Sequence, residues 1–527
     1  MHKKFNITGL CIPEDHYMVD ISGKINTIIT DYIQEGKYFT INRGRQYGKT
    51  TTLYLLEQQL KDRCLVISLS FEACDELFVS LYTLAAGLVR KIGRILKMQN
   101  VGHGLLDEWN QPVSEQFPLD DLSERITSLC SSVDKEIVLI IDEVDKSSDN
   151  QIFLSFLGLL RNKYMGQRKR TDCTFHSVIL ASVYDIKNLK VKLHPGEESK
   201  YNSPWNIAVD FSVDMDFMAN EIAAMLYEYE KEQQTGMDID AVSRQIYDYT
   251  SGYPYLVSRL CQIVEEKLAG TAFFPAKRDA WTRKGIVAAE LLLRKEPNTL
   301  FDDMVKKLTD YPKLKRMLQN ILFCGSIYPF ERDNDLINLG VTFAFLKEKN
   351  GAVAVKNRIF ETKLYDLFLS EMYTDYVNPQ TNSIERNQYI VNGSLQMKLV
   401  MEKFYQHFTE IYADSDWKFV EKQGRKIFLM YLKPIINGSG NYYIEAQTRD
   451  MRRTDIIVDY HGKQFVIELK IWHGSEYNQR GEKQLFEYLD YYGADTGYLL
   501  SFNFNKNKQT GIREISRYGK HIMEVVV

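Results

Sequence analysis

The first half of the chain alternates short, almost continuously apolar runs with longer stretches of helical periodicity. The apolar runs lie at Tyr38–Asn42, Leu65–Phe71, Ile137–Ile141 and Ser177–Ala181. Runs of this length and apolar content are typical of strands that are buried on both faces. Strands that alternate with helices form parallel sheets, so residues 1–275 are predicted to fold as an α/β domain around a parallel sheet.

The pattern changes after this domain. Residues 276–375 have helical periodicity and then two strand-like segments on either side of Asn350-Gly351. A two-residue hairpin turn needs positive φ at both positions, which Asn and Gly accept. Helices followed by such a hairpin predict a winged-helix-like domain. The segment 376–387, with its Pro, Asn, Ser and Thr residues, predicts a linker.

Residues 388–527 predict a third domain, again α/β. A long helical stretch at Leu395–Ala413 comes first, and a strand-rich block runs from Phe428 to Leu469. A helix near 481–492 and a last strand near Tyr498–Phe502 complete the expected set.

The triplet Gly48-Lys49-Thr50 stands between an apolar strand and a helical pattern, which is the context of a phosphate-binding loop. Backbone N–H groups at the helix N-terminus would face the phosphates of ATP. Lys49 would reach the β- and γ-phosphates, and the Thr50 hydroxyl would be a ligand of Mg²⁺. The simpler alternative is a Gly-Lys turn that only starts a helix.

The first turn of this loop departs from the usual pattern, which places a glycine five positions before Gly48. Arg43 occupies that position, and Gly44 follows one residue late. The turn is therefore predicted to have a different shape, with Arg43, Gly44 and Thr51 among the nucleotide-binding residues.

An acidic partner follows about 90 residues later, where five apolar residues end in Asp142-Glu143. Asp142 would orient the magnesium shell, and Glu143 would polarise the attacking water. Ser182, at the end of the next apolar run, is a candidate contact of the γ-phosphate. Each also has an ordinary structural interpretation, as a polar residue that ends a strand.

Several segments together resemble a known family. They are Phe5–Asp20, INRGRQYGKTT, WNIAVDFSVDMDF and SGYPYL. They resemble the AAA-ATPase-like proteins, whose relatives are additional-strand P-loop ATPases with a lid and a winged-helix domain. The resemblance covers most of residues 1–372 and implies ATP binding and hydrolysis. An arginine supplied by a second copy would imply a homo-oligomer, and the candidates are Arg161, Arg168 and Arg170.

A pair of carboxylates is predicted in the third domain, in TDIIVDYHGKQFVIELK. If His461-Gly462 is a two-residue turn, Tyr460 faces Lys463 and the same register places Asp455 opposite Glu468. Like charges at the ~5 Å spacing of cross-strand neighbours are destabilising, and a divalent cation would relieve this. Strand alternation puts Lys470 on the same face, where its ammonium can stabilise charge on a phosphate. An edge hairpin with solvated charges is the alternative.

This pattern resembles the PD-(D/E)XK nuclease superfamily, through YYIEAQT, RRTDIIVDY and QFVIELKIW. The resemblance implies that Asp455 and Glu468 are ligands of Mg²⁺ or Mn²⁺ and that Lys470 is catalytic. It also assigns Gln484 and Tyr488 to the superfamily's Q-x3-Y helix, and an acid of the first helix to Glu421, with Glu445 as the rival. Thr454 stands where the superfamily usually has proline.

Charge and composition restrict the partners. Lys and Arg number 66 against 70 Asp and Glu, a formal net charge of −4, which argues against a protein that simply coats nucleic acid. Any contact with nucleic acid needs a local basic patch, for which the candidates are Arg449, Arg452, Arg453, Lys506, Lys508, Arg513, Arg517 and Lys520.

Seven cysteines without a CxxC pair argue against a disulfide framework or a thiolate zinc site. No apolar run approaches the ~20 residues of a membrane span, and the N-terminus has no signal-peptide core. We therefore expect a cytoplasmic protein.

The leading hypothesis is an ATP-regulated, metal-dependent nuclease that acts on DNA, with a role in defence or mobile-element biology by family analogy. The alternative is an ATP-switched nucleic-acid-binding or signalling protein whose nuclease fold does not cut. A third and weaker alternative is an ATPase that acts on protein assemblies.

Overall fold

The computed structural model describes residues 3–144, 151–183, 186, 204–324, 326–376, 389–391, 393–411, 424–436, 440–447, 453–460, 463–471, 475–503, 510–517 and 519–527. The chain forms two compact units. The first contains residues 1–234, 252–262 and 338–344, and the second contains 235–251, 263–337 and 345–527. Each unit is described by itself.

The first unit is built on a four-stranded parallel sheet. Its order is β3 (Tyr38–Asn42), β6 (Ser177–Ser182), β5 (Ile137–Asp142) and β4 (Leu65–Ser70). All four predicted strands are confirmed to within one residue. β6, the last of them in sequence, lies between β3 and β5, and a parallel bridge from Phe39 to Val209 extends the free edge of β3. One strand thus separates the phosphate-loop strand from the strand that ends in Asp142.

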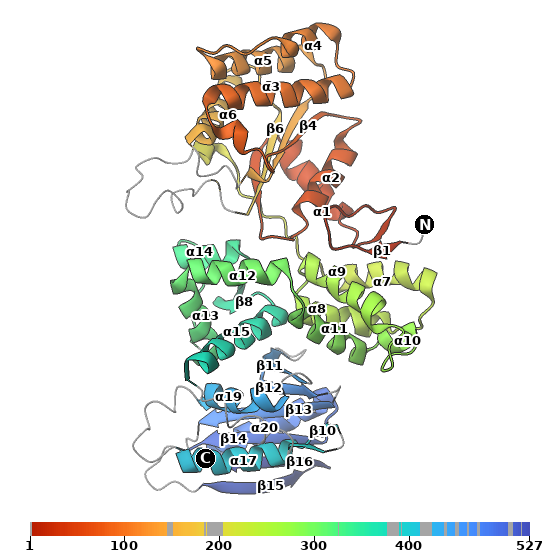
Figure 1. The fold of residues 1–527 in the computed structure, drawn as a ribbon, viewed down its shortest axis with the longest axis vertical. Coiled ribbons are helices and arrows are strands. Elements are labelled where there is room, and N and C mark those ends of the chain that lie inside the picture. The colour runs from red at the N-terminus through yellow and green to blue at the C-terminus, as the bar shows by residue number, and fades with distance from the viewer. Residues whose placement is uncertain are drawn as a thin grey trace. The chain divides into compact units, whose positions relative to one another are not determined.

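Helices cover this sheet on both sides (Figure 1). On one face, α3 (Leu81–Met98), α5 (Pro118–Ser132) and α6 (Gln151–Arg168) share an apolar core with β4, β5 and β6. The short helix α4 (His103–Asn110) packs against α3 and α5. On the other side lie α1 (Ser22–Ile28) and α2 (Lys49–Leu60), and α2 follows directly from the phosphate-binding loop.

A short N-terminal sheet completes the first unit together with two later helices. β1 (Lys4–Phe5) pairs with β2 (His16–Tyr17), and both pack on α7 (Ala219–Gln233). The rings of Phe5 and Tyr17 have their centroids 5.3 and 5.2 Å from that of Tyr229. α9 (Pro254–Ile263) returns to the phosphate-binding loop, as described below.

The second unit opens with helices and a hairpin. The helices are α8 (Ile239–Thr250), α10 (Lys277–Ala280), α11 (Arg283–Lys295), α12 (Thr299–Asp310), α13 (Pro312–Cys324) and α15 (Arg358–Tyr376). The hairpin consists of β7 (Leu346–Lys349) and β8 (Ala352–Val355), and the helix α14 (Asp335–Thr342) that comes before it in sequence belongs mostly to the first unit. The predicted turn is confirmed, because Asn350 and Gly351 have φ of 52° and 75°. Assignment of this region as a winged helix stays a prediction.

The rest of the second unit contains a six-stranded mixed sheet. Its order is β11 (Gly440–Gln447), β12 (Arg453–Tyr460), β13 (Lys463–Ile471), β14 (Thr496–Phe502), β16 (Lys520–Val526) and β15 (Gly511–Arg517). The central strands β13, β14 and β16 are parallel, and the outer pairs are antiparallel. A small hairpin of β9 (Ile390–Val391) and β10 (Ser394–Leu395) precedes this part.

Helices cover both faces of the six-stranded sheet. α20 (Ser475–Tyr492) packs Leu485 and Leu489 against Val466, Leu499 and Ile522. On the opposite face lie α17 (Met397–Ile411) and α19 (Gly424–Ile436), because the ring of Phe408 lies 5.6 Å from Phe502, whose side chain alternates with those facing α20.

Two expectations for this part were wrong. Residues 428–436 are helical in α19, where the buried residues recur with helical spacing at Phe428, Leu429, Leu432, Ile435 and Ile436. The strand at Tyr498–Phe502 is not the last, because β15 and β16 follow it. β15 forms one edge of the sheet and is mostly exposed, so its sequence lacks the apolar run of a buried strand.

Candidate nucleotide and nuclease sites

The phosphate-binding loop lies between β3 and α2, the strand-to-helix context that its sequence predicts. Gly48 caps α2 with φ of 77°, a left-handed conformation that favours glycine. Lys49 is 9% exposed, and its ammonium donates to the carbonyl oxygens of Arg43 at 2.9 Å and Gly44 at 3.0 Å. The loop thus closes over the lysine that would meet the phosphates.

Arg43 accounts for the irregular first turn. Its guanidinium donates to the Val213 carbonyl oxygen at 2.9 Å and lies over the Phe211 ring, 5.4 Å from its centroid. Its backbone N–H donates to the Ser182 carbonyl oxygen at 3.2 Å. The side chain therefore points away from the loop and is held by the segment beyond Val209, which explains how the loop accepts an arginine at a glycine position.

The acidic residues meet the loop at the carboxyl ends of the strands. The Thr50 hydroxyl donates to Asp142 Oδ2 at 2.9 Å, and the Glu143 backbone N–H donates to Asp142 Oδ1 at 2.8 Å. Glu143 has φ of 59°, and such strained residues cluster at functional sites. Ser182 ends β6 beside Asn42 and is fully buried, so its contact with a γ-phosphate stays a prediction.

The Gly-Tyr-Pro segment before α9 contacts the phosphate-binding loop. The Tyr253 hydroxyl donates to the Arg45 carbonyl oxygen at 2.5 Å, and its ring lies edge-on to Tyr47 with centroids 4.6 Å apart. The Tyr47 hydroxyl donates to Asp216. Burial, followed by the nearby Asp216 carboxylate, raises the pKa of Tyr47, so the hydroxyl stays protonated. These contacts hold the loop through residues that are distant from it in sequence.

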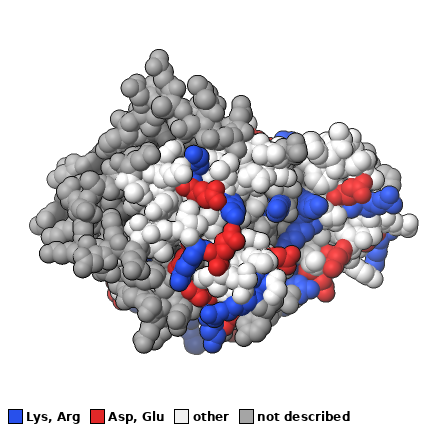
Figure 2. All heavy atoms as spheres, turned by 90° about the horizontal axis from the view of Figure 1, so that it is seen from below, with Lys and Arg blue, Asp and Glu red and all other residues white. Residues whose placement is uncertain are grey.

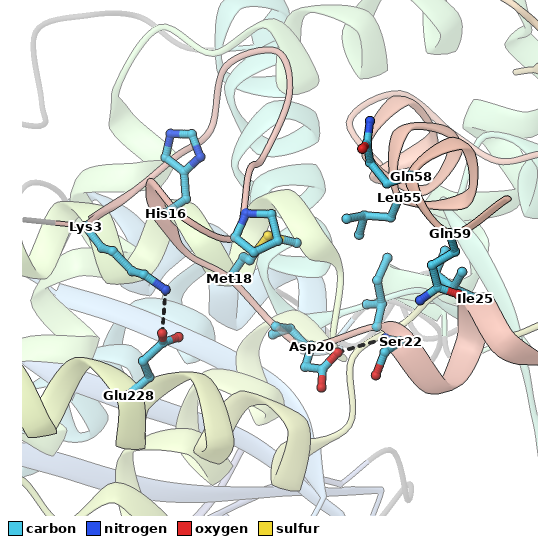
Figure 3. A pocket seen from close by; sticks show the side chains of 13 residues that line it. Lys3, His16, Met18, Asp20, Ser22, Ile25, Leu55, Gln58, Gln59 and Glu228 are labelled. Atoms are coloured by element: carbon cyan, nitrogen blue, oxygen red, sulfur yellow. Dashed lines mark hydrogen bonds and ion pairs between the residues drawn. The ribbon is translucent and has the colours of Figure 1, made fainter. Parts of the chain in front are cut away.

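A pocket of about 320 Å³ lies along the flank of α2. Figure 3 shows the Lys3–Glu228 ion pair, 2.6 Å long, across the pocket from Leu55 and Gln58. The Cys11 N–H donates to the Thr51 hydroxyl at 3.2 Å and so ties the N-terminal segment to the first turn of α2. None of the residues predicted to bind ATP lines this pocket.

The strand pairing of the predicted hairpin is confirmed for the pairs that the structure gives. Tyr460 faces Lys463, and the pairs continue in register to Ile456 and Ile467. Asp455 and Glu468 are the next residues on the two strands. The backbone therefore follows the register that would set the two acids opposite one another.

Glu468 and Lys470 lie together on the face of the sheet that α20 covers. Glu468 is 1% exposed, and its carboxylate accepts from the Lys470 ammonium at 2.6 Å. Lys470 also approaches Gln484 Oε1 at 3.5 Å, and Gln484 donates to the Tyr488 hydroxyl at 2.6 Å. The structure thus joins four of the six residues predicted for the nuclease site in one chain of contacts.

Other predicted residues lie outside the described part of the chain. Glu421, the turn His461-Gly462 and the basic residues Arg449, Arg452, Lys506 and Lys508 are among them. Asp455, Glu445 and Arg453 are described only as strand backbone. Among the described residues, no cluster of three or more His, Cys, Asp or Glu side chains could hold a metal, and that set does not include the Asp455 carboxylate.

The remaining basic residues near the C-terminus do not form an unpaired patch. Lys520 pairs with Asp490 at 3.0 Å, and Arg513 pairs with Glu482 and Glu524. The face in Figure 2 likewise carries Lys and Arg interspersed with Asp and Glu. Arg513 and Arg517 are exposed on β15, whereas Lys520 is half-buried. The three candidate arginines of the first unit, Arg161, Arg168 and Arg170, are also exposed.

Comparison with known families agrees with the two sites. The model of the AAA-like domain matches residues 17–322, which include the loop, Asp142 and the segment before α9. The chain belongs to this AAA-like family. The PD-(D/E)XK nuclease superfamily matches residues 441–515, which include β12, β13 and α20. This AAA-like protein therefore carries a PD-(D/E)XK nuclease superfamily domain near its C-terminus.

Individual relatives are distant. A curated relative, an uncharacterized WD repeat-containing protein of Synechocystis, is 22% identical over 322 residues, 56% of this chain and a quarter of the relative's length. The Walker-type ATPase of Pyrococcus abyssi is 14% identical, with a TM-score of 0.45 over 68% of this chain and 99% of that one. The Aeropyrum pernix ORC1 protein, solved in complex with DNA, is 13% identical, with a TM-score of 0.33 over 68% and 97%.

The sequence interpretation missed several contacts that surround these sites. Tyr47 and Asp216 are 169 residues apart, and Glu482, Arg513 and Glu524 come from three elements, so no local pattern links them. Gly519 has φ of 75° and lies between two seven-residue strands, β15 and β16. Counting outward from a hairpin turn at this glycine would have placed Arg513 opposite Glu524. Within the described part of the chain, no helix combines the length and apolar character needed to cross a bilayer.

Proposed function

We propose that this AAA-like protein binds and hydrolyses ATP, and that its C-terminal domain is a Mg²⁺-dependent nuclease that cuts DNA under control of the ATPase. The observation that carries the nuclease proposal is the burial of Glu468 beside Lys470. A carboxylate that is 1% exposed on a central strand is costly unless a cation accompanies it. The two residues are followed by Gln484 and Tyr488 on the helix that covers them.

The donor atoms at both sites suit magnesium. At the ATP site, the Thr50 hydroxyl and the Asp142 carboxylate are hard oxygen donors that already lie 2.9 Å apart. At the nuclease site, Glu468 and Asp455 would supply two carboxylates from adjacent strands. A bound Mg²⁺ would polarise the scissile phosphate and lower the pKa of a water molecule.

The other residues have roles that follow from their contacts. At the nuclease site, Lys470 brings a positive charge to the developing charge on the phosphate, and Glu468 holds its ammonium in place. Gln484 and Tyr488 would bind the substrate backbone. At the ATP site, Lys49 would exchange the carbonyl oxygens of Arg43 and Gly44 for phosphate oxygens, and Glu143 would orient the attacking water.

The proposal can be tested with the purified full chain. Linear, circular and single-stranded DNA, and an RNA of matched sequence, are incubated with Mg²⁺ or Mn²⁺, with and without ATP. We expect cleavage of DNA that is lost in Glu468→Gln and Lys470→Met. Lys463→Met, on the same strand but on the exposed turn end, is the matched control and should cut normally.

Two results would contradict the proposal. Cleavage that persists in Glu468→Gln would remove the hairpin from the mechanism. No cleavage by the wild type under any condition, with DNA binding that responds to ATP, would favour the switch alternative. Unchanged cleavage in Lys49→Ala would contradict only the proposed control by ATP, and the nuclease proposal would stand.

A further inference from the structure

A single arginine joins two buried carboxylates beside the candidate nuclease site. Glu482 on α20 is 5% exposed and Glu524 on β16 is fully buried. Arg513 on β15 donates through Nε to Glu524 and through Nη2 to Glu482 at 3.1 Å. A guanidinium presents its donors in a fixed planar fork, so one side chain can hold two acceptors at once.

This cluster shares a row of the sheet with the candidate site. Arg513 pairs with Glu524, Glu524 with Leu499, and Leu499 with Glu468 in the strand register. Residues in one row point to the same face, and strands lie ~4.8 Å apart. The backbones of Glu468 and Glu524 are therefore about 10 Å apart, and α20 covers both.

The link between the cluster and the site is α20 itself. Glu482 and Gln484 are two residues apart on this helix, and Gln484 contacts both Lys470 and Tyr488. A helix is rigid over one turn, so fixing Glu482 fixes the height and rotation of Gln484 above the sheet. Loss of the guanidinium that joins them would let water in between the two buried carboxylates or let them separate, and α20 would move with Glu482.

We propose that Arg513 is a positioning residue of the nuclease site, which holds Gln484 against Lys470 through Glu482 and Glu524. The proposal rests on the proposed nuclease function. Arg513 does not contact the substrate in this role. A direct contact with a DNA phosphate is the competing role, and the two predict different kinetics. Loss of a phosphate contact weakens binding in a salt-dependent way, whereas loss of positioning slows the cleavage step.

The test measures single-turnover cleavage of duplex DNA by the full chain with Mg²⁺. It gives the rate at saturating enzyme and the enzyme concentration for half that rate. For Arg513→Gln, we expect the saturating rate to fall about 10- to 100-fold, the scale seen when residues that support a metal site are removed. The half-saturation concentration should stay within about twofold. Arg513→Lys, which keeps the charge but not the fork, should recover part of the rate.

Glu514→Gln is the matched control, because Glu514 lies on the same strand, pairs with Lys398 at the surface and points to the opposite face of the sheet. It should leave the saturating rate unchanged. If Arg513→Gln does not fold, Glu482→Gln tests the same link. This change removes the negative charge that pairs with Arg513 but keeps the shape of the side chain and one acceptor oxygen. Its saturating rate should fall, with a melting temperature close to that of the wild type.

Three outcomes would overturn the inference. An unchanged saturating rate in both Arg513→Gln and Glu482→Gln removes Arg513 from the site. A raised half-saturation concentration with a weaker salt dependence identifies a phosphate contact instead. A lower melting temperature with an unchanged rate per folded molecule identifies a purely structural role. An inactive wild type would refute the proposed nuclease function, and this inference with it, whereas an active wild type with normal variants refutes only the role of Arg513.

Discussion

Replacing Thr50 with valine removes one hydroxyl and nearly keeps the shape of the side chain. That hydroxyl donates to Asp142 Oδ2 at 2.9 Å, and Asp142 is 8% exposed, so water can replace the bond only in part. A hydrogen bond to a charged acceptor contributes about 1.5–3 kcal/mol. Asp142 Oδ1 keeps the Glu143 N–H. We therefore expect the free energy of unfolding of the first unit to fall by about 2 kcal/mol.

The effect on nucleotide binding should depend on magnesium. With Mg²⁺, Thr50→Val removes one proposed oxygen ligand, and we expect the affinity for ATP to fall about 10- to 100-fold, which is about 1.4–2.8 kcal/mol. Without Mg²⁺, the hydroxyl has no metal to bind, and the affinity for ATP should change by less than about twofold.

Titration with a fluorescent ATP analogue, in Mg²⁺ and in EDTA, measures both quantities, and urea denaturation gives the stability. Thr50→Ser is the matched control, because serine keeps the hydroxyl. Equal affinity of Thr50→Val and Thr50→Ser for Mg·ATP would refute the assignment of the hydroxyl as a metal ligand. An equally large loss in EDTA would show that the hydroxyl acts on the loop and not through the metal.

Three further predictions concern the stability of the protein. The Lys163 ammonium, 2% exposed, donates to both Asp172 oxygens, and Lys163→Met should lower the free energy of unfolding by about 3 kcal/mol in urea, since Asp172 stays partly hydrated. Burial raises the pKa of Asp172, but its hydrogen bonds to Lys163, Thr127 and the Cys173 N–H lower the pKa overall. This stabilisation is therefore complete above about pH 4 and is lost as the pH falls through the lowered pKa. Denaturation curves between pH 7 and 3 should show stability falling with pH in the wild type and falling less in Lys163→Met. Gly252→Ala should lower the melting temperature more than Gly236→Ala, because both have φ near 75° but only at Gly252 would a Cβ lie 2.0 Å from the Phe217 carbonyl oxygen; equal losses would contradict this reasoning.

Residues that act through their neighbours in sequence could be predicted. The four strands of the first sheet are largely buried on both faces, so their sequences are almost continuously apolar and easy to recognise. Gly48 and Asn350-Gly351 occupy positive-φ positions that few other residues accept. The register of β12 and β13 follows from counting outward from a two-residue turn.

Residues that act through distant partners could not be predicted. Arg43 is tolerated in the loop because Phe211 and Val213 hold it, 168 and 170 residues later. Arg513 resembles a solvated surface charge until β15 is paired with β16, which brings Glu524 to it, and α20 is packed on the sheet, which brings Glu482. The helix α19 was misassigned because seven apolar residues within nine fit either a helix or a pair of strands when their partners are unknown.

The bond from Tyr253 to the Arg45 carbonyl oxygen has a consequence for the order of events on the ribosome. The two residues are 208 positions apart, and translation at roughly 5–20 residues per second separates their synthesis by about 10–40 s. The strands and the loop of the first unit can assemble during that interval, but without the hydrogen bond from Tyr253. Competence to hold a nucleotide should therefore arise abruptly, when little more than half of the 527 residues have been made and the Gly-Tyr-Pro segment has left the exit tunnel.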